Sequence, residues 1–199
     1  MQGKVCLITG ATSGIGKATA LGLARTGAHV VLVARNAEQG EAIRTEIRKQ
    51  SGNEAVELLL ADLSSQAAIR QLAHDFQARH QTLHVLINNA GVMLGRRTTT
   101  VDGIETMLAV NYLAPFLLTN LLLAVIQAST PARIINVASV PANIKINFAD
   151  LQASRNFSGF GQYQHTKLAL VLFTYELARR LQGTGVTVNC LHPGTVGTN

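Results

Sequence analysis

Short runs of apolar, often β-branched residues alternate along the chain with longer segments whose apolar positions recur at helical spacing. Regular alternation of this kind, with strands apolar on both faces, indicates a parallel sheet covered by helices. Right-handed crossovers favour the doubly wound strand order 3-2-1-4-5-6, so the predicted fold class is α/β in a single domain, residues 1–199. The predicted strands are KVCLIT (4–9), HVVLVA (29–34), AVELLLA (55–61), LHVLIN (83–88), ARIINVA (132–138) and VTVNCL (186–191), and the predicted helices start near Gly14, Asn36 and Ser65, cover 107–128 and include Tyr163.

The apolar segment 107–128 carries no charge over 22 residues, which is long enough to cross a bilayer. Polar residues and a proline interrupt it, and α/β proteins bury such helices against the sheet, so we expect a core helix and no membrane span. The first predicted strand follows Met1 closely, without the apolar region and cleavage site of a secretion signal. A cytoplasmic protein is therefore expected.

A formal net charge of +6 makes nucleic acid a possible partner. Lys and Arg are scattered, however, and the tightest runs are only GRR (95–97) and ARR (178–180). This distribution is typical of a solvated surface, so no nucleic-acid partner is expected.

The cysteines and histidines do not predict a disulfide or a metal site. Cys6 and Cys190 fall in strands three places apart, about 14 Å, whereas a disulfide needs Cα atoms within about 7 Å. His80 and His84 have i,i+4 spacing, but a helix-to-strand boundary falls between them and no third ligand is nearby. We therefore predict free cysteines and solvated histidines.

A glycine-rich loop, TGATSGIG at 9–16, follows the first strand and opens the first helix. Glycines at 10, 14 and 16 let the backbone approach a pyrophosphate, and the amino end of the helix supplies free N–H donors. This context favours a dinucleotide site over an ordinary turn.

The end of the second strand suggests which dinucleotide binds. An acidic side chain would meet the ribose of NAD there, but the sequence reads VLVARN, with Arg35 after the strand and Glu38 already in the next helix. A guanidinium suits a bidentate contact with a 2′-phosphate, which favours NADP(H). Lys17, directly after the glycine-rich loop, either adds positive charge to the same site or is an ordinary solvated side chain.

Polar residues also close the third and fourth strands, at Asp62 and at NNAG (88–91). Asp62 fits a turn former as well as a cofactor contact, while Asn88 and Asn89 at the switch point favour a shaped cofactor wall. In YQHTK, Tyr163 and Lys167 lie one helical turn apart and share a helix face.

Taken together, the glycine spacing, NNAG, Asn111, Ser139 and YQHTK resemble the short-chain dehydrogenase/reductase family over the whole chain. The long segment between Ser139 and Tyr163 is similar to the retinol dehydrogenase subgroup. The resemblance implies a Rossmann fold and an NADP(H)-dependent oxidoreductase that interconverts a lipophilic aldehyde or ketone and its alcohol, in a direction that the sequence leaves open.

The same resemblance implies a role for each matching residue. Tyr163 would exchange a proton with the carbonyl oxygen; a phenol is a poor base at neutral pH, so an ammonium at Lys167 would favour its phenolate. Ser139 would hydrogen-bond the substrate oxygen, and Asn111 would anchor a water leading to Lys167. The implied cofactor contacts are Gly10, Thr12, Ser13, Gly14, Ile15, Gly16, Arg35, Asp62, Leu63, Asn89, Ala90, Gly91, Tyr163, Lys167, Pro193, Gly194, Thr195 and Val196.

Two features bear on the substrate and on partners. Six apolar residues between Ser139 and Tyr163 either line one wall of a substrate pocket or pack a small satellite core. The final segment HPGTVGTN ends where relatives continue through a helical segment and a last strand. We therefore predict a shortened form of a longer enzyme. The alternative is a non-catalytic NADP-binding protein that acts through partners at an exposed sheet edge. A homodimer is possible. The six apolar residues are Ile144, Ile146, Phe148, Leu151, Phe157 and Phe160.

Overall fold

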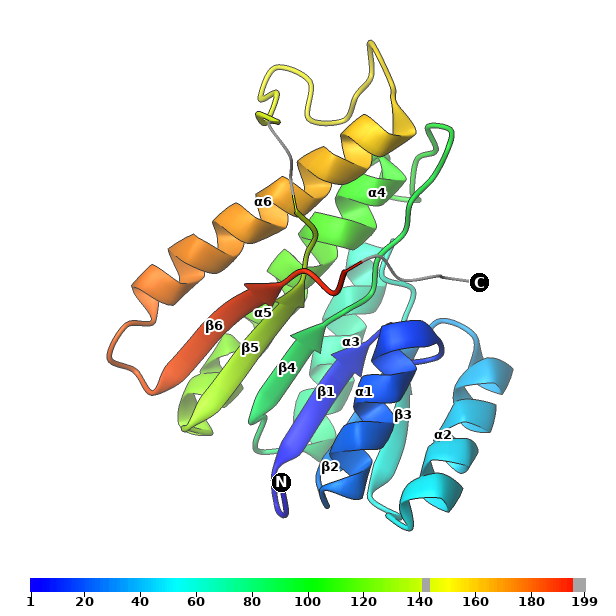
Figure 1. The fold of residues 1–199 in the computed structure, drawn as a ribbon, viewed down its shortest axis with the longest axis vertical. Coiled ribbons are helices and arrows are strands. Elements are labelled where there is room, and N and C mark those ends of the chain that lie inside the picture. Colours follow the sequence, from blue (N-terminus) through cyan, green and yellow to red (C-terminus); the bar gives the residue numbers. More distant parts are fainter. Residues whose placement is uncertain (141–143, 195–199) are drawn as a thin grey trace.

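A parallel sheet of six strands forms the centre of the molecule, in the order β3-β2-β1-β4-β5-β6 (Figure 1). The structure, a computed structural model, describes residues 1–140 and 144–194. The strand order confirms the prediction and places the switch point between β1 and β4. The strands are β1 (Val5–Thr9), β2 (His29–Ala34), β3 (Val56–Leu60), β4 (Val85–Asn88), β5 (Ala132–Val137) and β6 (Val186–Leu191).

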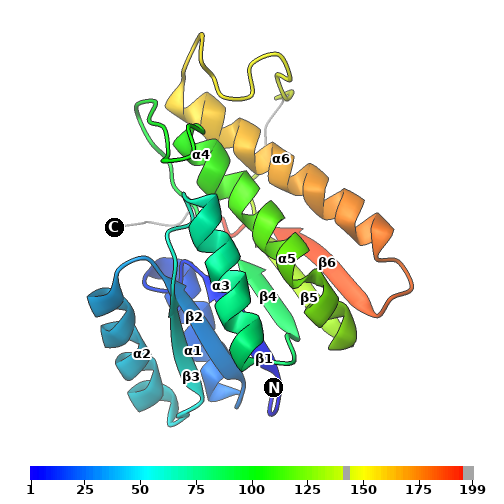
Figure 2. The ribbon, with the colours of Figure 1, turned by 180° about the vertical axis from the view of Figure 1, so that it is seen from behind.

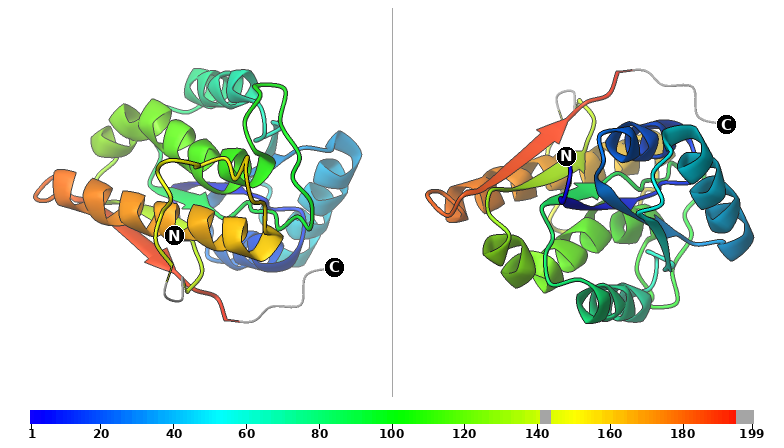
Figure 3. Two further views of the ribbon diagram at one scale, coloured as in Figure 1. Left: turned by 90° about the horizontal axis from the view of Figure 1, so that it is seen from above. Right: turned by 90° about the horizontal axis from the view of Figure 1, so that it is seen from below.

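Helices lie on both sides of the sheet. Figure 1 shows the first two helices in front of the strands, and Figure 2 shows α3, α5 and α6 across the opposite face. The view from below in Figure 3 shows the resulting three layers edge-on. The helices are α1 (Gly14–Arg25), α2 (Ala37–Ser51), α3 (Gln66–Arg79), α4 (Thr106–Leu108), the π-helical turn η1 (Ala109–Leu113), α5 (Ala114–Ala128) and α6 (Gly159–Arg180).

The central strand β1 and the edge strand β6 are covered by helices to different extents. All residues of β1 are buried, because one hydrophobic core lies under α1 and α2 and the other under α3, α5 and α6. In β6 burial alternates instead: Val186 and Val188 are buried, while Thr187 and Asn189 are exposed. Among the described residues no helix lies in front of β6 (Figure 1), so this strand is packed on one face only, whereas Ile135 and Val137 of β5 still contact the core under α1 and α2.

Helix boundaries follow capping chemistry. The side chain of Asn36 accepts a hydrogen bond from Gln39 N at the start of α2, and the Ser65 hydroxyl accepts one from Ala68 N at the start of α3. Both predicted starts are confirmed with a shift of one residue, because the capping residue itself keeps an extended backbone.

The long apolar segment forms one helical stretch, Thr106–Ala128, with a π-helical turn inside it. By length and composition this stretch could cross a membrane, and half of its most apolar window is buried inside the structure. Leu118, Leu122 and Ile126 are fully buried in the core beneath the sheet. The packing agrees with the predicted core helix.

The cysteines match the prediction, whereas the histidines do not. Cys6 and Cys190 are free, on strands separated by β4 and β5. His80, expected to be solvated, is only 9% exposed, because it caps α3 and packs against the ring of Phe76. His84 is half-buried, and its Nδ1 accepts a hydrogen bond from Val5 N.

Candidate active site

The glycine-rich loop after β1 leaves no room for a side chain at Gly10 or Gly16, whereas a Cβ at Gly14 would meet no atom within 4 Å. Gly10 has a φ of 64°, and a Cβ there would lie 2.8 Å from the Cα of Ala90. A Cβ at Gly16 would overlap the carbonyl oxygen of Gly10 and lie 2.5 Å from Asn89 Nδ2. The loop therefore packs directly on the chain that follows β4.

The first helix also begins differently from its neighbours. The side chains of Asn36, Ser65 and Ser158 cap α2, α3 and α6, but the Ser13 side chain makes no capping hydrogen bond at the start of α1. The first N–H groups of α1 are thus left to the groove beside them. An uncapped helix amino end next to a glycine loop is a suitable binding site for a phosphate.

Hydrogen bonds hold this loop at the switch point. Asn89 Nδ2 donates to the carbonyl oxygens of Thr9 and Gly10, each at 3.0 Å. The Thr9 hydroxyl accepts from the backbone N–H groups of Asn89 and Ala90. Asn88 is different: it is buried and donates to Thr119 and Asn136, away from the loop. Of the two residues predicted to form a cofactor wall, only Asn89 lines the groove.

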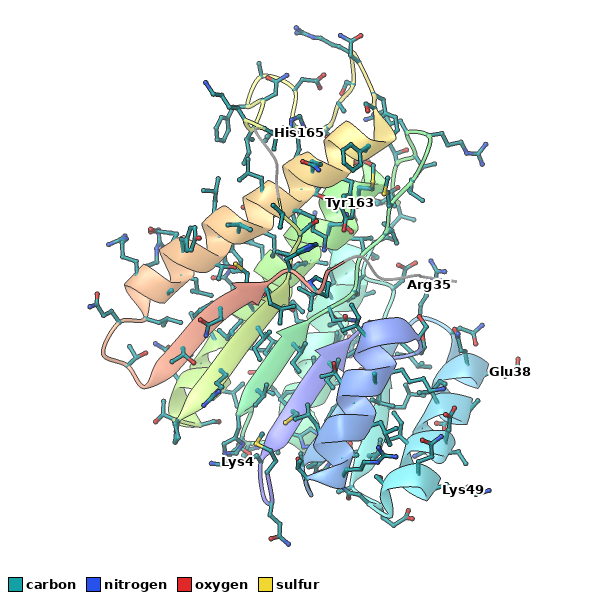
Figure 4. The ribbon with its side chains drawn as sticks, viewed as in Figure 1. Lys4, Arg35, Glu38, Lys49, Tyr163 and His165 are labelled. Carbon is teal, nitrogen blue, oxygen red and sulfur yellow. The ribbon has the colours of Figure 1, made fainter. Side chains whose placement is uncertain are left out.

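A groove of about 690 Å³ crosses the carboxyl edge of the sheet. Figure 4 shows Arg35 and Tyr163 at this edge and Lys4 at the opposite one. The groove brings together most of the predicted cofactor residues, including Pro193 and Gly194; Thr195 and Val196 lie outside the described residues. The predicted residues that line it are Gly10, Thr12, Ser13, Gly14, Ile15, Arg35, Asp62, Leu63, Asn89, Ala90, Gly91, Tyr163, Lys167, Pro193 and Gly194.

One end of the groove carries the exposed guanidinium of Arg35. Lys17, the other basic candidate, instead forms an ion pair with Glu46, with Nζ 2.8 Å from Oε2. Asp62 lines the groove and also accepts a hydrogen bond from Ser64 N, so it both forms a turn and faces the site. Arg35 therefore supplies the positive charge at the end of the groove beside β2.

Tyr163 and Lys167 lie together in the groove, as their spacing predicts. Lys167 Nζ is 5.7 Å from the centroid of the Tyr163 ring and donates to the carbonyl oxygen of Val137 at 2.8 Å. The lysine is 4% exposed, and burial lowers its pKa from the ordinary 10.5 to about 8. At neutral pH it still carries its charge, close to the tyrosine.

Asn111 is buried behind this pair, within the π-helical turn. Its Oδ1 accepts from Val92 N at 2.8 Å, and its Nδ2 donates to Val92 O and to the hydroxyl of Thr166. The side chain is thus occupied by protein partners. Pro115, four residues later, has no N–H to donate to the backbone carbonyl of Asn111, and a water held by Asn111 stays a prediction.

Ser139 lies two residues beyond the end of β5 and is half-buried. Among the described residues, the groove is lined by Val137 and Ala138 from this segment and not by Ser139. Its contact with a substrate oxygen remains a prediction.

The six apolar residues after Ser139 do not gather at Tyr163. Ile146, Phe148 and Leu151 line a second cavity of about 540 Å³, with α4, η1 and the side of α6 that carries His165. Ile144, Phe157 and Phe160 line neither cavity. Val92, Met93, Val110, Val137 and Ala138 instead supply apolar lining to the groove that holds Tyr163.

Three contributors were missed at the sequence level. Thr9 orders the turn after β4, and Thr166 joins the Asn111 side chain to the backbone of Tyr163, whose carbonyl oxygen accepts its hydroxyl at 2.8 Å. Met93, 57% exposed, borders the groove. The available signals were a threonine closing a buried strand, a hydroxyl between Tyr163 and Lys167, and an apolar residue directly after NNAG.

Comparisons with known proteins agree with this geometry. The family model described as short chain dehydrogenase matches residues 4–199. The chain is 51% identical over 197 residues to human retinol dehydrogenase 12 and 43% identical over 203 residues to human polyprenol dehydrogenase, in each case over 98% of this chain and 62% of the relative. It therefore spans less than two thirds of the length of these relatives. A metagenomic short-chain oxidoreductase solved in complex with NADP is similar with a TM-score of 0.81 and 32% identity, over 98% of this chain and 83% of that one.

Proposed function

The chain belongs to the short-chain dehydrogenase family, and from this premise we propose that it is an NADP(H)-dependent oxidoreductase acting on lipophilic aldehydes or ketones and their alcohols. The observation that carries the proposal is the meeting of Tyr163 and Lys167 with the glycine loop in one groove. Similarity to retinol and polyprenol dehydrogenases supports the lipophilic substrate class.

The groove fits a dinucleotide. Gly10 and Gly14 line the groove without side chains, Gly16 lets α1 pack against Gly10 and Asn89, and the uncapped start of α1 offers N–H groups to a pyrophosphate. Arg35 would hold a 2′-phosphate, since its chain neighbours Ala34 and Asn36 offer no carboxylate to bind a ribose hydroxyl. Asp62, Leu63 and the backbone of 89–91 would line the remainder.

A bound nicotinamide dinucleotide supplies or accepts the hydride. The protein transfers the proton: the Tyr163 hydroxyl gives its proton to the carbonyl oxygen in reduction, and the Tyr163 phenolate takes the proton of the alcohol in oxidation. The Lys167 ammonium, held by Val137 O and shielded from water, stabilises the phenolate that reduction leaves. Met93 and Val110 offer apolar surface to the substrate beside the reacting groups.

Tyr163→Phe tests this assignment. The substitution removes the transferable proton and leaves the ring, so turnover should fall by about 100- to 10,000-fold. The affinity for NADPH should stay within about twofold, because the ring keeps its place in the groove. The assay follows NADPH absorbance with a panel of lipophilic aldehydes, and NADPH binding by fluorescence.

Tyr175→Phe is the matched control, because this tyrosine lies on the same helix and is 66% exposed. It should behave as the wild type. Normal turnover by the Tyr163 variant would refute the assigned role. A wild-type chain that binds NADPH and turns over none of the aldehydes would favour the second candidate, a cofactor-binding protein that acts through partners at the exposed sheet edge, which is β6.

A further inference from the structure

Two histidines and a glutamate meet at the amino edge of the sheet, opposite the groove. His29 begins β2, Glu57 is the second residue of β3, and His80 caps the end of α3. Glu57 pairs with Val31 in the ladder, which places its side chain on the same face as that of His29. Because α3 covers this face and ends at this edge, its cap residue closes the group.

The distances within this group are short. His29 Nε2 lies 2.7 Å from Glu57 Oε1, and His80 Nε2 lies 3.3 Å from Glu57 Oε2. One ligand atom from each residue lies within 4.8 Å of those from the other two. The side chains of His29 and Glu57 are each 31% exposed, so the group opens to solvent on one side.

His80 is the unusual member. Its side chain is 8% exposed, and its Nε2 has no hydrogen-bond partner although Glu57 Oε2 is close. A buried polar atom without a hydrogen bond needs an explanation, because burial costs it the hydrogen bonds of water.

From this geometry we propose that His29, Glu57 and His80 bind one Zn²⁺ ion, with water as the fourth ligand. Two imidazole nitrogens and a carboxylate oxygen suit zinc, whereas calcium and magnesium prefer oxygen ligands alone. Around tetrahedral zinc, with bonds of about 2.0 to 2.2 Å, ligand atoms lie roughly 3.3 to 3.6 Å apart. The contact between His80 and Glu57 already has this length, and half-exposed His29 has room to adjust.

Such an ion would act on the fold and not on the reaction. Its ligands join β2, β3 and α3 at the sheet edge farthest from Tyr163. The unfolded chain does not hold these three residues together, so zinc would bind the folded state preferentially. The proposal is independent of the oxidoreductase assignment.

The test uses the whole chain, stripped of metal with a chelator and titrated with zinc sulfate by calorimetry. We expect one Zn²⁺ per chain and a Tm higher by about 5 to 10 °C at a hundredfold excess over Kd. His29→Gln and Glu57→Gln should each weaken zinc binding by at least about tenfold, a loss that even changes outside the ligand shell can cause. Both side chains are half-exposed, so the variants should fold, as circular dichroism would verify.

His74→Gln is the control, since His74 is a 76% exposed histidine beside Asp75 on the same helix as the His80 cap. It should bind zinc within about twofold of the wild type. Absence of zinc binding by the wild type would overturn the proposal and leave a hydrogen bond between His29 and Glu57. Zinc binding that both folded variants retain would overturn it too, because the ion would then lie elsewhere.

Discussion

The strands on the two sides of β4 differ in how they are packed. On one side, β1 and β2 are buried on both faces, and the loops at their carboxyl ends supply the glycine cradle and Arg35. On the other side, β6 is packed on one face among the described residues, and Tyr163 and Lys167 reach the groove from α6.

This contrast separates two tasks. The region around β1 and β2, the first region, would bind a cofactor through the shape of its backbone. An added Cβ at Gly10 or Gly16 would collide with main-chain atoms that cannot move away. The second region contributes a few side chains, of which buried Lys167 is held by one carbonyl oxygen. Cofactor affinity should therefore depend on packing in the first region, and turnover on individual groups in the second.

The largest effect on cofactor affinity is expected from Gly16→Ala. The new Cβ would meet the carbonyl oxygen of Gly10 and the Asn89 side chain, forcing the loop away from β4. NADPH affinity should fall by at least about 100-fold, roughly 3 kcal/mol. Gly22→Ala on the same helix is the control, because a Cβ there meets no atom within 4 Å. If fluorescence titration gave both variants a similar affinity for NADPH, the glycine-rich loop would not be a cofactor-binding segment.

Lys167 should make stability depend on pH. Its pKa is about 8 when folded and near the ordinary 10.5 when unfolded, so between these values the unfolded chain binds more protons. The free energy of unfolding should rise with pH across this window, by up to about 3 kcal/mol, as the folded protein loses a buried charge.

Urea denaturation at several pH values tests this, with Lys167→Met as the comparison. Cys6, whose pKa burial raises to about 11, titrates in an overlapping range with the opposite sign, so only the difference between the two proteins reports on Lys167. If the free energies of unfolding of the two proteins changed with pH in parallel, the Lys167 ammonium would not be destabilised in the folded state. A residue that costs stability in a groove is typical of a functional site.

Packing itself can be compared across the sheet. Val30 and Val31 of β2 point into opposite cores, so replacing either by Ala should cost about 2 kcal/mol. In β6, Val188→Ala should cost a similar amount, whereas Leu191→Ala, at a 44% exposed position, should cost less than about 0.5 kcal/mol. If urea denaturation gave Val188→Ala and Leu191→Ala equal losses of stability, the open face of β6 would be covered in solution.

The sequence predicted the first region better than the second. Strand order follows from the alternation of short apolar runs with segments of helical spacing, and the glycine loop from its place directly after the first strand. In the second region only the approach of Tyr163 to Lys167 follows from a local pattern, their spacing of one helical turn. The π-helical turn around Asn111 and the second cavity behind α6 depend on contacts between distant segments. No local pattern distinguishes an apolar residue that faces Tyr163 from one that lines another cavity. The His29, Glu57 and His80 group was hidden for the same reason, since its members are far apart in the chain.

Arg35 offers the smallest and most selective test of the comparison. It belongs to the first region, yet it acts through one side chain, so its loss should change cofactor choice without disturbing the cradle. Arg35→Ala should weaken NADPH binding about tenfold, the equivalent of one charge-assisted contact of roughly 1.4 kcal/mol, and leave NADH binding nearly unchanged. Lys17→Ala is the control, because that ammonium is already paired with Glu46. Equal affinity of the wild type for NADPH and NADH would contradict the preference, while a loss shared by both cofactors would place Arg35 in the shape of the groove and not in recognition of a 2′-phosphate.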